Sequence, residues 1–164
     1  MQPEARSTHV DSIEAHPVSE LVACPPETGI LLPCSAQSLS FDAAQVIFRQ
    51  SSLCQGLYLV VSGQLLRRTE RLNTRLVLGN ARPGDLLELA AVLGDRHHTY
   101  SLIAQSPASL LMLPIESLHQ AFKSYPPLRM KLLEELAREV SRAYRACRAS
   151  KGMRARRSTI SSLV

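Results

Sequence analysis

Two adjacent histidines and four separate cysteines are the residues of this chain that could do chemistry. His97 and His98 are neighbours, so on a strand their rings face opposite sides and do not meet at one ion. The cysteines stand at positions 24, 34, 54 and 147, with no Cys-x-x-Cys pair. This spacing indicates ordinary reduced thiols, with an iron–sulfur or redox-sensing role as the alternative. We therefore expect no metal site.

Sequence patterns for catalysis or nucleotide phosphate binding are not found. The chain has no Gly-x-Ser-x-Gly and no Gly-rich phosphate loop. We expect neither an enzyme nor a bound cofactor.

The elements that must position these side chains begin with short apolar runs. They predict β-strands at 30–32, 45–48, 57–61, 64–66, 75–78, 100–104 and 110–113. Ser62-Gly63 predicts a tight hairpin turn, and Pro83-Gly84 predicts a second turn. Many short strands with regular turns are typical of a sandwich or barrel.

The last third of the chain has helical character. Residues 114–124 predict a short helix with one apolar face, and the Pro-Pro pair at 126–127 ends it. Residues 128 to about 151 contain no Gly or Pro and predict a long helix.

The long helix carries apolar or small residues at steps of three and four, which is the pattern of a coiled-coil seam. The seam residues are Leu133, Leu136, Val140, Ala143 and Cys147. They predict a dimer, and the alternative is a helix that packs only on its own β-domain.

In this order, the pieces resemble a known family. They are Gly56-x-Tyr58-x-x-x-Ser62-Gly63, then Pro83-Gly84-Asp85, then Thr99-Tyr100-Ser101-Leu102-x-Ala104, followed by the two helices. The pattern resembles the cyclic-nucleotide-binding fold over residues 21–150, and most closely the sensor domain of bacterial Crp/Fnr-type transcription regulators. The resemblance implies a mainly β fold with C-terminal helices: a double-stranded β-helix (jelly roll) followed by a long helix that forms a parallel dimer.

We divide the chain accordingly into four parts. They are a mobile N-terminal arm (1–20), a β-roll (21–125), the long helix (126–150) and a basic tail (151–164). Family members read DNA with a winged helix-turn-helix after the long helix, whereas 14 residues follow Ser150. We therefore expect a sensor domain without that reader, in which residues 157–164 are either a native tail or the opening of a domain cut short.

The family's phosphate cassette is altered in this chain. After Pro-Gly-Asp, cyclic-nucleotide binders have two apolar residues, then Gly-Glu, and later Arg-Ser/Thr-Ala. The Gly position is Glu88, the Glu position is Leu89, the Arg position is His98 and the Ser/Thr position is Thr99. Only Thr99 keeps the type of the family residue.

These changes predict poor binding of cyclic nucleotides. Glu88 places a carboxylate where an anion would lie, and Leu89 accepts no hydrogen bond from ribose. Each lost charge-assisted hydrogen bond costs on the order of 1.5–3 kcal/mol, so affinity should fall by several powers of ten. Binding of cAMP or cGMP, with Arg96 reaching into the cassette, remains the alternative. The candidate ligand-binding residues are Glu88, Leu89, Ala90, Arg96, His98 and Thr99.

A metal-dependent enzyme of the cupin kind uses a similar jelly roll. It needs a His-x-His pair, a following Glu and a later His, and this set is not in the sequence. The jelly roll therefore gives no reason to expect an enzyme.

Basic residues are concentrated at the C-terminal end. The net charge is +5, and residues 121–164 hold 11 Lys and Arg against 3 Asp and Glu. The pattern indicates nonspecific contact with nucleic-acid phosphates, and the alternative is a solvated helix face with a disordered end. The candidate nucleic-acid residues are Arg148, Lys151, Arg154, Arg156 and Arg157.

The sequence has no long apolar stretch and no secretory signal at its start, so we expect a cytoplasmic protein with no membrane partner. The function that we infer is a dimeric module in transcription regulation that binds a small effector or a protein partner. The dimer is either a homodimer or a heterodimer with a full-length relative. The alternative function is a DNA-associated protein that acts through its basic end.

Overall fold

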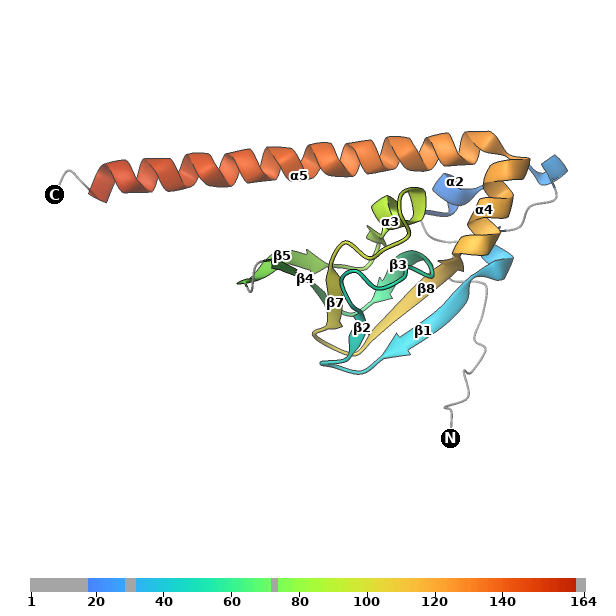
Figure 1. The fold of residues 1–164 in the computed structure, drawn as a ribbon, viewed down its shortest axis with the longest axis horizontal. Coiled ribbons are helices and arrows are strands. Elements are labelled where there is room, and N and C mark those ends of the chain that lie inside the picture. Colours follow the sequence, from blue (N-terminus) through green and yellow to red (C-terminus); the bar gives the residue numbers. More distant parts are fainter. Residues whose placement is uncertain (1–17, 29–31, 72–73, 162–164) are drawn as a thin grey trace.

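The computed structural model describes residues 18–28, 32–71 and 74–161. Within them, the chain forms two antiparallel four-stranded sheets, with the helices at one side (Figure 1). One sheet has the order β1-β8-β3-β6 and the other the order β2-β7-β4-β5. The strands are β1 (Gln37–Phe41), β2 (Val46–Phe48), β3 (Gly56–Ser62), β4 (Leu65–Arg71), β5 (Thr74–Ala81), β6 (Leu86–Leu87), β7 (Ser101–Ala104) and β8 (Ala108–Pro114).

The strand pairing is nested. β1 pairs with β8, β2 with β7, β3 with β6 and β4 with β5, all antiparallel. This arrangement winds the chain as a double-stranded roll, so the predicted jelly roll is confirmed.

Helices follow and cover the roll. They are α2 (Val18–Val22), α3 (Leu89–Leu93), α4 (Ile115–Ser124) and α5 (Pro126–Ser161), with 3-10 helices at Pro26–Thr28 and Leu32–Ser35. The long helix begins earlier and continues further than predicted, so its backbone includes residues 151–161, which the sequence assigned to a tail. None of the helices in the described ranges combines the length and the apolar content that crossing a membrane requires.

Six of the predicted strands are present, and one prediction was wrong. The run 30–32 was expected to form a strand, but Leu32 begins a 3-10 helix, and residues 29–31 lie outside the described residues. The strand β1 was missed because its sequence, QSLSF, is polar and exposed at a sheet edge. The predicted arm also lies outside the described residues up to residue 17, and its last residues belong to α2.

The two predicted turns connect strands of the roll. Gly63 has φ +90, and a Cβ there would lie 2.6 Å from the carbonyl oxygen of Pro107, so only glycine fits. At the second turn, the backbone N–H of Gly84 donates to the carbonyl of Val60 at 2.9 Å, and Gly84 has φ +98. This turn leads directly into β6 and the cassette.

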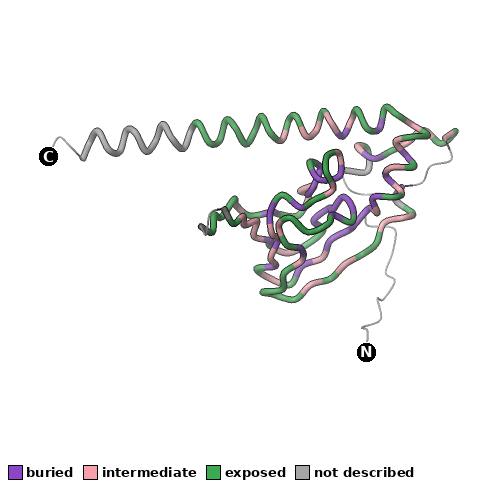
Figure 2. Tube along the Cα trace, viewed as in Figure 1, coloured by how far each residue is buried: buried purple, intermediate pink, exposed green. Residues whose placement is uncertain are grey.

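The core lies between the sheets and continues under the helices. Its largest fully buried side chains include Leu57, Leu65, Leu102 and Leu110 from the strands. The first turns of α5 contribute Leu128 and Leu132 to the same cluster. Further along, α5 leaves the roll and its side chains become exposed (Figure 2).

Candidate functional site

Glu88 connects β6 to α3 in an unusual backbone conformation. Its φ and ψ are 73° and 23°, the left-handed region that glycine adopts most readily. The carbonyl of Glu88 accepts the N–H of Val92 at 2.9 Å, which starts the helix. Glu88 therefore has a backbone conformation that suits the glycine predicted for this position in the family.

His98 lies against Glu88 in the interior. His98 Nδ1 and Glu88 Oε2 are 3.4 Å apart, and their side chains are 2% and 0% exposed. The distance is within ion-pair range, but no hydrogen bond joins the two groups. The imidazole ring stacks on Phe48, with centroids 3.8 Å apart and planes at 4°. The ring is therefore held in place on one face.

Cys54 completes a buried cluster with these two residues. One ligand atom each of Cys54, Glu88 and His98 lies within 4.8 Å of the other two. Burial, with a smaller contribution from the nearby Glu88 carboxylate, raises the pKa of the Cys54 thiol to about 11. The thiol donates to the carbonyl of Gly56 at 3.2 Å. Sequence reasoning missed Cys54 because it lies on a different segment, with no short spacing to mark it.

Two tyrosines border the cluster. Burial raises the pKa of Tyr58 to about 12, and burial together with the Glu88 charge also raises the pKa of Tyr100. Their rings lie 5.4 Å and 5.8 Å from that of Phe48. Aromatic side chains therefore pack beside the cluster.

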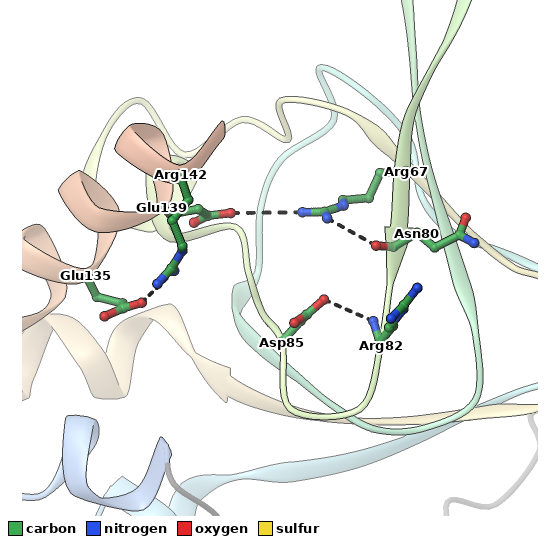
Figure 3. A network of polar contacts seen from close by, with 7 residues as sticks. All are labelled: Arg67, Asn80, Arg82, Asp85, Glu135, Glu139 and Arg142. Carbon is green, nitrogen blue, oxygen red and sulfur yellow. Dashed lines mark hydrogen bonds and ion pairs between the residues drawn. The ribbon is translucent and has the colours of Figure 1, made fainter. Parts of the chain in front are cut away.

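A separate cavity of about 580 Å³ lies between α5 and the roll. Its charged lining residues are Glu20, Arg67, Asp85, Glu135, Glu139 and Arg142, and Leu89 forms part of its apolar wall. Figure 3 shows how the charges meet across it: Arg67 contacts Glu139 at 4.0 Å and donates to the carbonyl of Asn80 at 3.2 Å.

The two α5 carboxylates in this cavity differ in their surroundings. Burial raises the pKa of Glu139, partly offset by Arg67. The hydrogen bond from Arg142, 2.9 Å long, lowers the pKa of Glu135. The cavity therefore presents carboxylates and guanidinium groups side by side.

Comparison with known proteins identifies the family. Residues 38–125 match the family described as cyclic nucleotide-binding domain. The chain belongs to this family. The sequence has no significant match among curated proteins.

Solved structures of transcription regulators and of their N-terminal or sensor domains share the fold. The catabolite activator protein of Thermus thermophilus is 25% identical with a TM-score of 0.64, over 79% of this chain and 61% of that chain. This chain thus spans less than two thirds of that protein. The sensor domain of the transcriptional regulator DNR from Pseudomonas aeruginosa is 18% identical with a TM-score of 0.66, over 82% and 89%. The N-terminal domain of a Streptomyces coelicolor transcriptional regulator is 21% identical with a TM-score of 0.59, over 84% and 95%.

These comparisons confirm the resemblance to Crp/Fnr sensor domains that the sequence indicated. Sensor domains of this family are typically not enzymes. This chain is therefore a Crp-like sensor domain of the cyclic nucleotide-binding type.

The structure brings only some of the six candidate ligand residues of this domain together. Glu88 and His98 meet, whereas Leu89 is buried in the core. Ala90 and Thr99 are exposed. The guanidinium of Arg96 points to Glu116 of α4, 3.5 Å away, rather than into the cassette. Arg96 therefore does not replace the family's phosphate-binding arginine in this conformation.

Neighbouring side chains on α5 contact several of its arginines. Arg138 forms ion pairs with Glu134 and Glu135 at 3.6 Å and 3.2 Å, and Arg142 also contacts Glu135. Arg148 lies over the ring of Tyr144 at 6.0 Å. The other candidate nucleic-acid residues have side chains outside the described part; they are Lys151, Arg154, Arg156 and Arg157.

Proposed function

We propose that this domain is a cytoplasmic, dimeric sensor in transcription regulation whose cassette does not bind cyclic nucleotides. The observation that carries the proposal is the buried contact between Glu88 and His98, at the cassette positions where the family has Gly and Arg. Regulation by another small effector or by a protein partner is then the function that the arrangement supports best.

Electrostatics gives the first reason. A cyclic phosphate in the cassette would lie against the Glu88 carboxylate, whose side chain is fully buried. Like charges repel strongly where water does not screen them. A glycine at this position would leave room and offer its N–H, but Glu88 fills the space with a charged side chain.

The donor set gives the second reason. His98 stacks on Phe48 and faces Glu88, so it offers a single ring N–H in that direction. A guanidinium would give two parallel, charge-assisted hydrogen bonds to phosphate. The cavity between α5 and the roll is a better candidate for an effector, because it is open to a ligand and carries polar groups on both walls.

Calorimetry with cAMP and cGMP tests the proposal. We expect no binding heat from the natural chain at a ligand concentration of about 1 mM. A dissociation constant of about 1 mM corresponds to a binding free energy of about 4 kcal/mol. The double variant Glu88→Gly/His98→Arg restores two family residues and should gain measurable affinity for cAMP.

The variant Arg96→Ala is the matched control. It removes the nearest alternative guanidinium and should leave the calorimetric result unchanged. Micromolar binding of either nucleotide by the natural chain would overturn the proposal, and loss of that binding in Arg96→Ala would show that Arg96 had moved into the cassette.

A further inference from the structure

We propose that Cys54, Glu88 and His98 form a buried site for one divalent transition-metal ion of the zinc and cobalt(II) class. The sequence predicted no metal site, because His97 and His98 are adjacent and no Cys-x-x-Cys pair is present. The inference goes beyond the proposed function, which requires only that Glu88 and His98 block the cassette.

The spacing of the ligand atoms is close to what such an ion requires. Bond lengths of about 2.0–2.3 Å at tetrahedral angles place ligand atoms about 3.3–3.8 Å apart. His98 Nδ1 and Glu88 Oε2 are already separated by 3.4 Å, and all three ligand atoms lie within 4.8 Å of one another. Binding would therefore need side-chain shifts of about 1 Å.

Three polar atoms of the cluster have no hydrogen-bond partner in the part of the chain that the structure describes. Among the described residues, both carboxylate oxygens of Glu88 and Nδ1 of His98 are buried and unsatisfied. A buried carboxylate without full compensation is costly, and a bound cation compensates it. A divalent ion would satisfy all three atoms at once.

The backbone at Glu88 is also strained. A left-handed φ of 73° is unfavourable at a residue other than glycine. Such strain persists where the surrounding structure holds the residue in place, and it clusters at ligand-binding sites. The strained backbone here aims the Glu88 carboxylate inward at His98.

The mixture of sulfur, nitrogen and oxygen donors favours a metal of this class. Thiolate and imidazole select zinc and related first-row ions, whereas magnesium and calcium prefer oxygen alone. A carboxylate that binds through both oxygens would give four donor atoms from three residues. On binding, the Cys54 sulfur gives up its proton and forms the metal–sulfur bond, and the proton leaves to solvent.

The site would join three segments of the cassette region. The Cys54 N–H donates to the carbonyl of Arg96 at 2.7 Å, and the His98 N–H donates to the carbonyl of Ser52 at 2.9 Å. The unfolded chain does not hold the three ligands together, so the metal would bind only the folded chain. Binding should therefore raise the thermal stability.

Cobalt(II) titration of the full chain, after treatment with a chelator and under reducing conditions, tests the site. We expect one equivalent to bind, with a thiolate-to-cobalt charge-transfer band and the intense visible bands of a tetrahedral ion. Zinc should displace the cobalt and raise the melting temperature. The isosteric variants Glu88→Gln and Cys54→Ser should weaken binding by more than about 100-fold.

Two exposed residues provide matched controls, since His97 is the neighbour of His98 and Cys34 is an exposed thiol. His97→Gln and Cys34→Ser should bind cobalt as the natural chain does. The proposal is wrong if the natural chain binds less than one equivalent, if the spectrum lacks the thiolate band, or if the control variants lose it. Should Cys54→Ser not fold, the spectrum of the natural chain and the affinity of Glu88→Gln decide.

Discussion

Glu88 combines a left-handed backbone, full burial and unsatisfied polar atoms, and His98 shares the burial and an unsatisfied ring nitrogen. Cys54 adds a buried thiol to the same place. These residues are held by hydrogen bonds of their backbone and by stacking on Phe48 rather than by solvent. Changes at this scale should therefore alter stability and ligand binding together.

We expect the buried phenol of Tyr58 to lower the stability of the fold in alkali. This side chain lies at the border of the cluster. Its pKa rises from 10.0 to about 12 on folding, chiefly because of burial. Between these values the unfolded chain loses the proton and the folded chain keeps it, so the free energy of unfolding falls as pH rises. When the pH rises from about 9 to about 11, the free energy of unfolding of Tyr58→Phe should fall by about 1 kcal/mol less than that of the natural chain.

Urea unfolding at the two pH values measures this difference. Tyr144 is 63% exposed on α5, so Tyr144→Phe is the matched control and should follow the natural chain. Equal pH dependence in the Tyr58→Phe variant and the natural chain would show that burial does not hold the proton on this phenol.

At the scale of elements, α5 has two faces with different roles. Leu128 and Leu132 are fully buried against the roll. Since each residue advances by about 100° around a helix, the predicted seam is centred about 80° away from them. On this second face Leu133 and Leu136 are half-buried, and Val140 is 59% exposed within the single chain. The exposed part of the seam is available to a second copy.

The variant Val140→Asp tests the seam as a dimer interface. A carboxylate from each helix in an apolar seam would be poorly solvated and close to its like-charged copy. The dimer dissociation constant should rise at least about tenfold, equivalent to 1.4 kcal/mol. Analytical ultracentrifugation over a range of concentrations measures it.

Ser141→Asp adds the same charge to an exposed position outside the seam and is the control. It should leave the dissociation constant close to that of the natural chain. A natural chain that stays monomeric at high concentration would contradict the dimer, and equal effects of the two variants would contradict the seam.

At the scale of the whole molecule, a compact roll carries a helix that extends well beyond it (Figure 1). α5 has 36 residues, about 54 Å at 1.5 Å per residue. Only its first part packs on the roll, and the link from Arg67 to Glu139 lies near the point where the helix leaves it. Helices without tertiary packing are marginal in water.

Hydrogen exchange along α5 should therefore depend on protein concentration. We expect slow exchange near Leu128 and Leu132 at all concentrations, because these side chains are in the core. Amides from 140 to 148 should exchange quickly in dilute protein and slowly in concentrated protein, where a second copy covers the seam. Protection of these amides that does not change with concentration would show that the single helix is stable without a partner.

The sequence alone determined the local elements and the family. Short apolar runs, glycine turns and a long stretch free of Gly and Pro depend on interactions between near neighbours, so they could be predicted. The sequence also placed Glu88 and His98 at the altered cassette positions. The polar edge strand β1 escaped prediction, because pairing with β8 rather than its own side chains stabilises it.

Only the tertiary structure decided which side chains meet. It brought Cys54 to Glu88 and His98, directed Arg96 to Glu116, and set Glu135 beside Arg142. The first two contacts join segments far apart in the chain, and the side-chain directions follow from how the strands and helices pack. Residue types and spacing along the chain do not specify these directions, so the buried cluster emerged only from the folded structure.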